Sequence, residues 1–404
     1  MSFQKKSIKD LSKSQLSDQK VLVRVDFNVP LSEGQISDDT RIKAALPTIN
    51  YLLENNASVI LCSHMGRPKG ERVEKLSLKP VAERLTEKLK MNVSLLDDCV
   101  GESVFSKVSQ MKRGEVVLLE NLRFHKEETA NHPYFSKQLA NLADIFVQDA
   151  FGVVHRAHAS TSGVCEFLPS YAGFLIQKEL EFLGGAIAEP KRPLIAIIGG
   201  SKISSKIGVL RHLLGLVDTL IIGGAMTYTL LKAQGSETGS SMVEDEFKDE
   251  AMAFLKEAET STTTVLLPLD HVCATEFSVD SQIDVFDTEA FPNDRMGLDV
   301  GPKTIDAINE ALEGAGTVIW NGPLGVFELA PFSKGTFAVA ETLSKSSAIT
   351  IIGGGDSAAA ISKVGLSDTM SHISTGGGAS LEFLEGKVLP GIDVLEDNKV
   401  PVND

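Results

Sequence analysis

The 404-residue sequence predicts an α/β protein with two domains, each built on a parallel sheet. A chain of this length exceeds the usual size of one domain. Short apolar runs of β-branched and aliphatic residues recur without polar alternation, which is typical of strands buried on both faces of a sheet. Stretches with helical periodicity separate these runs, and helical connections make the strands parallel.

The apolar runs are the expected strands. They begin at Val21, Ser58, Val116 and Asp144 in the first half, and at Leu194, Thr219, Thr263, Val318 and Ala348 in the second. Segments beginning at Val81 and Glu244 carry apolar residues three and four apart, which predicts amphipathic helices. Residues 172–193 form a helical stretch with two adjacent glycines and two prolines, and we expect the domain junction there.

The composition excludes several classes of protein. Hydrophobic residues make up 43% of the chain and charged residues 23%, as in water-soluble globular proteins. No run approaches the roughly 18 apolar residues that a membrane span requires, and the N-terminus lacks the apolar core of an export signal. The four cysteines are far apart and include no C-x-x-C pair, which fits a reducing cytoplasm and indicates neither a zinc knuckle nor a disulfide framework.

The charge is distributed unevenly. The net charge of −15 disfavours nonspecific binding to nucleic acid or to anionic lipid, so neither partner is expected. Residues 1–170 hold 23 Lys and Arg against 21 Asp and Glu, a net of +2, while residues 171–404 hold 16 against 33, a net of −17. This asymmetry predicts that the first half binds a strongly anionic molecule.

Unusual polar residues and glycines follow the expected strands. Because ligands of open parallel sheets bind beyond the carboxyl ends of the strands, each domain should carry a site at that edge. In the first half the donors there are arginines and histidines, which bind carboxylate and phosphate well. They are Arg24, Arg41, His64, Arg67, Arg123, His125, His155, Arg156 and His158, accompanied by Asp26 and Asn28.

Two other interpretations of these first-half residues remain open. Any one arginine could form a surface ion pair instead. His64, His155 and His158 could be zinc ligands, although no Cys or acidic partner stands at ligand spacing and the intervening Arg156 would repel a dication.

Glycine-rich turns characterise the second half. In IIGGSKISSKIGVL, from Ile197, two glycines end a strand, and Lys202 and Lys206 are expected four apart on one face of an opening helix, an arrangement suited to phosphate. It lacks the spacing of a P-loop. GGGDSAAA, from Gly353, satisfies G-x-G-x-x-A and leaves a nicotinamide-dependent dehydrogenase as an alternative. Asp356 within it is expected either to hold Mg²⁺ or to cap a helix.

The motifs together resemble the phosphoglycerate kinase family. The matching stretches occur in order over some 350 residues: RVDFNVP, DDTRI, HMGRPKG, ENLRFHKEE, QDAFGVVHRAHAS, GGSKISSKI, WNGPLGVFE, GGGDSAAA and STGGGASLE. The resemblance implies a glycolytic kinase that transfers a phosphoryl group reversibly between MgATP and the carboxylate of 3-phosphoglycerate, giving ADP and 1,3-bisphosphoglycerate. It also implies a cytoplasmic monomer whose domains close by hinge bending.

The resemblance also implies roles for individual residues. The acid would be bound by Asp26, Asn28, Arg41, His64, Arg67, Arg123 and Arg156. The nucleotide would be bound by Gly200, Lys202, Lys206, Gly297, Asn321, Glu328, Gly354, Gly355, Asp356 and Ser357, with Asp356 on the magnesium. The chemistry of the implied reaction adds catalytic roles: Arg41 and Lys202 are expected on the transferring group, Lys206 on the nucleotide phosphates, and the helix entrance around Gly377 on developing oxygen charge.

The domain bounds follow from the same resemblance. We expect two Rossmann-like α/β/α domains, an acid-binding domain over residues 1–171 and a nucleotide-binding domain over 189–376, joined by an interdomain helix over 172–188 across a cleft. Residues 377–404 should return to the first domain. Gln148 and Ser205 depart from the family's usual Asn and Asp. A closing two-domain anion sensor without turnover is the remaining, non-enzymatic alternative.

Overall fold

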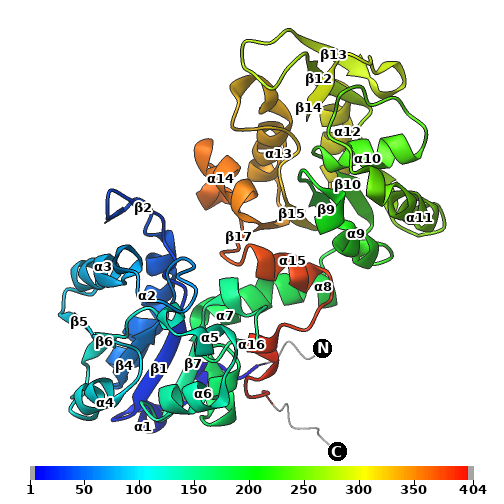
Figure 1. The fold of residues 1–404 in the computed structure, drawn as a ribbon. Helices are drawn as coiled ribbons and strands as arrows, with labels where there is room; N and C mark the ends of the chain where they lie inside the picture. Colours follow the sequence, from blue (N-terminus) through cyan, green and yellow to red (C-terminus); the bar gives the residue numbers. More distant parts are fainter. Residues whose placement is uncertain (1–4, 399–404) are drawn as a thin grey trace, which may run out of the picture. The chain divides into compact units, whose positions relative to one another are not determined.

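The structure, a computed structural model, describes residues 5–398. The chain divides into two compact units. One unit takes Met1–Glu181 with Val388–Asp404, and the other takes Phe182–Lys387. Each unit is a sheet with helices on both of its faces (Figure 1).

The sheet of the first unit has six parallel strands in the order β5-β6-β4-β1-β7-β8. These are β1 (Lys20–Val25), β4 (Ser58–Cys62), β5 (Val93–Leu95), β6 (Val116–Leu118), β7 (Ile145–Asp149) and β8 (Ser170–Ala172). A two-stranded hairpin of β2 (Leu31–Ser32) and β3 (Gln35–Ile36) lies outside this sheet. The central strand β1 pairs with β4 on one side and with β7 on the other.

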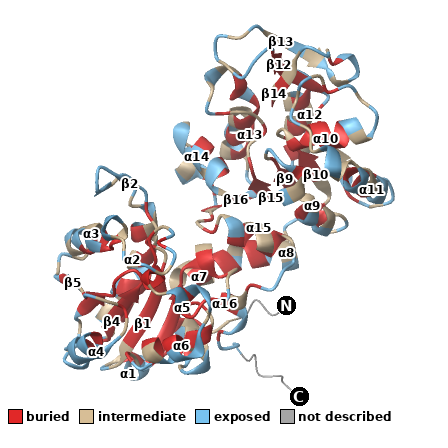
Figure 2. Cartoon of the chain, in the orientation of Figure 1, coloured by how far each residue is buried: buried red, intermediate tan, exposed pale blue. Residues whose placement is uncertain are grey.

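Both faces of this sheet are buried, which explains the unbroken apolar runs in the sequence. Val21 and Val23 of β1 belong to a core with Ile49 of α2 (Thr40–Glu54) and Leu85 of α3 (Lys79–Leu89). The intervening Leu22 belongs to a second core, with residues of α4 (Glu102–Ser109) and α6 (Pro133–Ala140). Figure 2 shows the buried strands of this sheet. Alternate side chains therefore enter opposite helical layers.

The second unit repeats this architecture. Its parallel sheet has the order β11-β10-β9-β15-β16-β17. The strands are β9 (Leu194–Ile198), β10 (Thr219–Ile222), β11 (Thr264–Leu266), β15 (Thr317–Asn321), β16 (Ile349–Gly353) and β17 (His372–Ile373). A separate antiparallel sheet, in the order β13-β12-β14, is formed by β12 (Asp270–Ala274), β13 (Ile283–Asp287) and β14 (Met296–Val300).

Helices complete the layers. The first unit also contains α1 (Lys13–Leu16), α5 (Lys126–Thr129), α7 (Phe174–Glu179) and α16 (Pro390–Asp393). The second contains α8 (Gly185–Ala188), α9 (Ile207–Leu213), α10 (Met226–Ala233), α11 (Lys248–Glu259), α12 (Pro302–Leu312), α13 (Lys334–Lys345), α14 (Gly355–Lys363) and α15 (Gly378–Leu384). Among the described residues, no helix is both long and apolar enough to span a membrane.

The α/β fold class with parallel sheets is confirmed, and each apolar run singled out in the sequence contains a strand. The strands β5, β8 and β17 were not predicted because they are only two or three residues long. The antiparallel sheet was not predicted because β13 is partly exposed and the buried β12 begins with the polar residues Asp270 and His271. Residues 172–193 contain α7, a π-helical turn at Leu180–Gly184, and α8. The C-terminal segment pairs with the first unit through Gly391 N–H to Val154 O (2.8 Å) and Glu396 N–H to Ser170 O (3.0 Å).

Asp149, at the end of β7, is a buried carboxyl whose protonation affects folding. Its Oδ1 accepts the backbone N–H of Leu175 at 2.9 Å. Burial raises the pKa of Asp149 from 3.8 to about 7. The unfolded chain therefore loses this proton at lower pH than the folded chain does, and the free energy of unfolding falls as pH rises from 3.8 to about 7.

We expect Asp149→Asn to remove this loss, worth about 1.4 kcal/mol for each unit of pKa difference. The difference in Tm between Asp149→Asn and the wild type should be more positive at pH 8 than at pH 5, as measured by calorimetry across this range. Parallel Tm curves for the two proteins would contradict the assignment.

Candidate active site

The carboxyl edge of the first sheet gathers the polar residues of the first unit. Asp26 and Asn28 follow β1, His64 follows β4, and Asn121 and Arg123 follow β6. Strands β1, β4 and β6 are neighbours in the sheet, so these side chains come together although up to 97 residues separate them in sequence. This is the edge at which parallel sheets bind ligands.

Hydrogen bonds join these residues into one network. Arg41 Nη1 donates to Asp26 Oδ2 at 2.9 Å and to the carbonyl of Asn28 at 3.2 Å. Asn28 Oδ1 accepts Gly66 N–H at 2.9 Å, and the carbonyl of Gly66 accepts Arg123 Nη1 at 2.8 Å. The Gly66 turn thus links Arg123 directly, and Arg41 through Asn28, into one network.

His64 is held as a neutral imidazole. It is buried, and its Nδ1 accepts from Nη2 of Arg24 at 3.2 Å. Burial and the charges of Arg24 and Arg123 hold its pKa well below the ordinary value. Because a guanidinium is always a donor, the ring proton lies on Nε2, where it can be donated to an anion.

Arg24 and Glu128 form a charged support that the sequence interpretation missed, since Arg24 was counted only among the donors and Glu128 was not considered. Arg24 Nε donates to Ser160 Oγ at 2.8 Å, and Ser160 Oγ donates to Glu128 Oε1 at 2.6 Å. Both charged side chains are wholly buried. Burial raises the pKa of Glu128 against the opposing charge of Arg24. Sequence spacing gives no signal for this contact, because 104 residues separate the two.

A cavity of about 260 Å³, here called the anion pocket, opens beside this network. Its lining consists of Arg67, Lys69, Gly70, Arg123, His125, Thr129, Arg156 and His158. Burial, together with the charges of Arg24 and Arg156, lowers the pKa of Arg123 to about 10. A bound phosphate would offset the repulsion between these positive charges.

The second unit holds a larger cavity of about 730 Å³, here called the glycine pocket. Four residues singled out from the sequence line it: Gly200, Gly297, Glu328 and Asp356. Its apolar wall includes Met242, Phe277, Leu298, Val326 and Leu329. Such a pocket suits a ligand with a flat apolar part and a charged end.

Glycines allow the strand ends beside this pocket to approach closely. Gly224, at φ +74°, would place a Cβ 2.4 Å from the carbonyl oxygen of Gly200. A Cβ on Gly199 would lie 2.1 Å from the carbonyl oxygen of Pro323. Side chains at these positions would push apart the ends of β9, β10 and β15, so the turns depend on glycine.

Lys206 brings a cation to this edge. Its Nζ donates to Asn321 Oδ1 at 2.5 Å, at the end of β15. Burial lowers the pKa of Lys206 to about 8, although Asp356 and Glu385 favour its charged form. Ser357 Oγ accepts Gly322 N–H at 2.7 Å, and Gly354 lies against Asn321. A bound anion would raise the pKa of this lysine further.

The expected placement of the two lysines on one helix face is wrong. Residues Ile203–Ser205 form a 3₁₀ turn, and α9 begins only after Lys206. Ser205 Oγ donates to the carbonyl of Lys202 at 2.9 Å and so closes the turn. The side chain of Lys202 is exposed, and its charge acts on the nearby Glu244. Burial raises the pKa of Glu244, but the hydrogen bonds from Ser204 and the charge of Lys202 together lower this pKa overall.

Two other expected positions are now placed. Asp356 is exposed in the first turn of α14, whose N-cap is Gly354, so Asp356 is not the helix cap. Gly377 is the N-cap of α15 at φ +50°.

Gln148, which departs from the family's usual Asn, is buried. Its Nε2 donates to Thr161 O at 3.3 Å and its Oε1 accepts Ala150 N–H at 3.2 Å.

Tyr228 and His271 line the glycine pocket, and the sequence interpretation missed both. Thr288 Oγ1 donates to Pro268 O, so it accepts the Nε2 proton of His271 at 2.9 Å. His271 Nδ1 then accepts the Tyr228 hydroxyl at 3.1 Å. His271 comes from β12, in the antiparallel sheet that the apolar pattern did not reveal.

Comparisons with known proteins agree with this geometry. The family model described as phosphoglycerate kinase matches residues 8–387. A phosphoglycerate kinase of Borrelia turicatae is 56% identical over 390 residues, covering 96% of this chain and 100% of the relative. One of Clostridium botulinum (strain Eklund 17B / Type B) is 56% identical over 400 residues, covering 98% and 100%.

A solved structure gives the same result. The phosphoglycerate kinase of Coxiella burnetii superposes with a TM-score of 0.89 at 43% identity, covering 96% of this chain and 98% of that one. The matches cover nearly the whole chain and therefore both units. The chain belongs to the phosphoglycerate kinase family, whose members are phosphoryl-transferring enzymes.

Proposed function

We propose that this enzyme transfers a phosphoryl group reversibly between MgATP and the carboxylate of 3-phosphoglycerate, forming ADP and 1,3-bisphosphoglycerate. In glycolysis the reaction would run toward ATP. One observation carries this proposal: each unit holds a different pocket, one lined by arginines and the other lined by glycines with an apolar wall. The family relatives, named for this reaction, support it.

The chemistry requires no general base. The attacking carboxylate has an ordinary pKa near 4 and is ionised at neutral pH. His64 is neutral and already accepts a hydrogen bond on Nδ1, so it suits binding rather than proton abstraction. The work left to the protein is to bring two anions together and to neutralise charge in the transition state.

We assign the acid to the first unit. Arg67, Arg123 and Arg156 would bind its phosphate in the anion pocket, and His64, Asp26 and Asn28 would orient its carboxylate and hydroxyl ends. The ion pair of Arg41 with Asp26, at 2.9 Å, would release the guanidinium toward the transferring group when a stronger anion arrives.

We assign the nucleotide to the second unit. Its base would lie against the apolar wall around Gly297 and Leu298, with Glu328 on the ribose and the glycine turns at Gly200 and Gly354–Ser357 near the phosphates. Lys206 and Asn321 would contact the phosphates, and Lys202 would follow the transferring group. Backbone N–H groups at the start of α15, from Gly377, would stabilise oxygen charge.

The residues present fit a magnesium ion bound with the nucleotide. Asp356 supplies an exposed carboxylate on the lining of the glycine pocket, and its charge is felt by Lys206. Carboxylate and phosphate oxygens are the ligands that Mg²⁺ prefers. When bound there, the ion would neutralise nucleotide phosphate charge, while Lys206 and the backbone amides orient the nucleotide.

The two binding sites belong to different units, so we propose that transfer requires the units to close over both substrates. The corresponding domains would be residues 1–171 and 189–376, with 172–188 as interdomain helix. Of the expected C-terminal segment 377–404, the described part that packs with the first unit begins at Val388. Closure would also exclude water, which would otherwise hydrolyse the acyl phosphate. We further propose a monomer acting in the cytoplasm, a location supported by four cysteines that are all free.

The activity is tested by incubating the protein with MgATP and 3-phosphoglycerate and measuring ADP. We expect ADP to form only when the acid is present, and to cease when EDTA removes the magnesium. A protein that binds both ligands without acid-dependent ADP would be a sensor rather than a kinase. A saturable change in NADH fluorescence on titration would instead favour the dehydrogenase alternative. The G-x-G-x-x-A sequence behind that alternative lies in the last helical crossover of the second sheet.

Gly297→Ala is expected to weaken nucleotide binding selectively. The added Cβ would lie 1.8 Å from the Tyr228 hydroxyl, so the pocket wall must shift. We expect the KM for ATP to rise about tenfold, equivalent to about 1.4 kcal/mol, with the KM for 3-phosphoglycerate unchanged. Steady-state kinetics with each substrate varied in turn will show this, and an unchanged KM for ATP would exclude the base from this wall.

A further inference from the structure

His125 lies in the wall of the anion pocket, yet no role has been assigned to it. It shares the pocket lining with Arg67, Arg123 and Arg156, the arginines proposed for the phosphate of the acid. It stands at the junction of a 3₁₀ turn, Leu122–Phe124, and α5. The ring is about half-buried, so it is positioned by the protein and still reaches the cavity.

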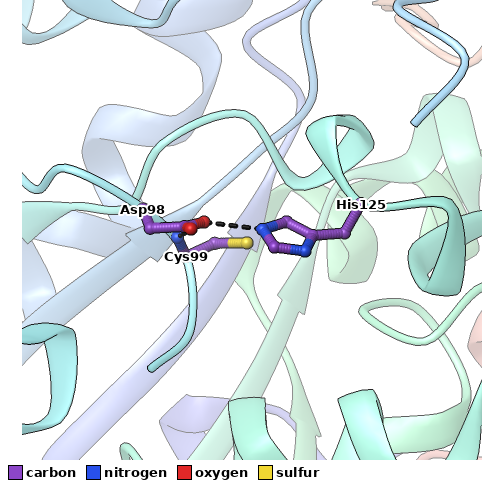
Figure 3. Close-up of side chains that lie close together, drawn as sticks. All are labelled: Asp98, Cys99 and His125. Carbon is purple, nitrogen blue, oxygen red and sulfur yellow. Dashed lines mark hydrogen bonds and ion pairs between the residues drawn. The ribbon is translucent and has the colours of Figure 1, made fainter. Parts of the chain in front are cut away.

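Asp98 fixes the orientation of this ring (Figure 3). His125 Nε2 lies 2.7 Å from Asp98 Oδ1, and the same oxygen accepts the backbone N–H of Cys99 at 2.7 Å. Cys99 is wholly buried, so the loop that carries Asp98 is anchored in the core. Phe135 of α6 packs against the imidazole, with ring centroids 5.3 Å apart.

The charges around the ring favour its protonated form. Asp98 raises the pKa of His125 through the hydrogen bond and its charge, Glu127 of α5 adds to this, and burial opposes it. Other charged groups also face this region: Arg72, whose own pKa Asp98 helps to raise, and the pocket cations Arg67, Lys69, Arg123 and Arg156. The carboxylate in direct contact outweighs these more distant cations.

His158, the other histidine of this pocket, behaves in the opposite way. Burial and the charges of Arg123 and Arg24 lower its pKa to about 4. At neutral pH it is therefore an uncharged ring, although its Nδ1 lies 3.8 Å from Oε1 of the buried Glu128, whereas His125 is hydrogen-bonded to Asp98 at 2.7 Å. Of the two histidines that line the anion pocket, His125 is the one equipped to carry a positive charge to a ligand.

We propose that His125, oriented by Asp98, is a further binding residue for the phosphate monoester of the acid substrate, and that Asp98 is its positioning residue. The proposal rests on the proposed function of the anion pocket. With Nε2 committed to Asp98, the ring offers its charge and its Nδ1–H to the ligand. A phosphate dianion gains from such charge-assisted contacts, which are stronger than hydrogen bonds between neutral groups.

A metal site is a poorer use of the same side chains. Ligand atoms of Asp98, Cys99 and His125 lie within 4.8 Å of one another. Within residues 5–398 this is the cluster of potential metal ligands, and it differs from the three histidines considered from the sequence. The Asp98 and His125 ligand atoms already bond to each other at 2.7 Å. Burial also raises the pKa of the Cys99 thiol well above its ordinary value, so the thiolate that a metal needs is disfavoured.

The test is the pH dependence of the KM for 3-phosphoglycerate at saturating MgATP, from pH 6 to 9, in the wild type and in His125→Gln, Asp98→Asn and His132→Gln. His132 is an exposed histidine seven residues along the chain and serves as the matched control. All four proteins experience the same ionisation of the substrate, so the differences between their profiles report on the protein.

We expect His125→Gln to raise the KM about tenfold at pH 6.5 with little change in kcat, because the phosphate it contacts is not the one transferred. The ratio of the His125→Gln KM to the wild-type KM should fall as pH rises, because the wild-type ring then loses its proton. Asp98→Asn should keep a KM close to that of the wild type at pH 6. Its KM should then begin to rise at a lower pH than the wild-type KM does, because Asp98 no longer raises the pKa of His125. His132→Gln should follow the wild type.

Parallel KM profiles for the wild type and His125→Gln would overturn the inference, as would an unshifted profile for Asp98→Asn. Calorimetric titration of each protein with 3-phosphoglycerate, without nucleotide, measures the same pocket independently of turnover. If the wild type binds the acid with this His125 dependence but forms no ADP, the proposed function fails and the inference stands. If ADP forms and His125→Gln has no effect on either readout, only the inference fails.

Discussion

Lys206→Ala is expected to lower kcat by about 10²- to 10³-fold, the effect of removing one charged contact from a preorganised transition-state site. Lys206 is partly buried and its Nζ is fixed 2.5 Å from Asn321 Oδ1, so little reorganisation is needed before reaction. Because burial lowers its pKa to about 8 in the free enzyme, the activity of the wild type at low nucleotide concentration should fall above that pH.

Steady-state kinetics and single-turnover measurements will separate this loss from weaker nucleotide binding. Lys345→Ala, an exposed lysine at the end of α13, is the matched control and should keep the wild-type rate. A kcat within twofold of the wild type for Lys206→Ala would remove this lysine from the mechanism. Lys202→Ala should also lose rate, and full retention would contradict the role proposed for that residue.

Arg123→Ala is expected to raise the KM for 3-phosphoglycerate on the order of 10²-fold, because it removes a buried guanidinium from a charged contact. Arg123 lines the anion pocket and also donates to Gly66 O at 2.8 Å, which couples it to Asn28. Arg123→Lys should recover only part of the loss, since an ammonium cannot reproduce the planar fork.

The control for this variant is Arg113→Ala. Arg113 is an exposed arginine of the same unit whose partner is Asp18, far from the pocket lining. It should leave the KM unchanged and have little effect on the free energy of unfolding, because exposed ion pairs contribute little to stability. If Arg123→Ala binds the acid as tightly as the wild type, the phosphate does not occupy this pocket.

The central strands could be predicted because burial on both faces leaves a plain signal. Val21, Leu22 and Val23 are all inaccessible to solvent, so the centre of β1 is apolar on both faces of the sheet. In contrast, β13 is partly exposed and antiparallel, with Asp284 and Asp287 along it, and its sequence resembles a loop. The partner strand β12 is fully buried, but it begins with the polar residues Asp270 and His271, so it is not an apolar run and His271 was missed.

The site was predictable where function depends on residue type and not where it depends on distant contacts. Arginines and glycines after strands mark both pockets directly, and Gly200, Gly297, Glu328 and Asp356 do line one cavity. The support from Arg24 through Ser160 to Glu128 depends on tertiary packing. The error at Lys202 and Lys206 has a local cause, since buried Ile203 holds a 3₁₀ turn where helical spacing was assumed.

Closure of the two units over their substrates is the claim on which the proposed mechanism depends most. The radius of gyration, measured by solution X-ray scattering for the free enzyme, each binary complex and the ternary complex, tests it directly. We expect the full decrease only when 3-phosphoglycerate and MgATP are both present. The same radius of gyration in all four samples would show that phosphoryl transfer proceeds without closure and would contradict this account.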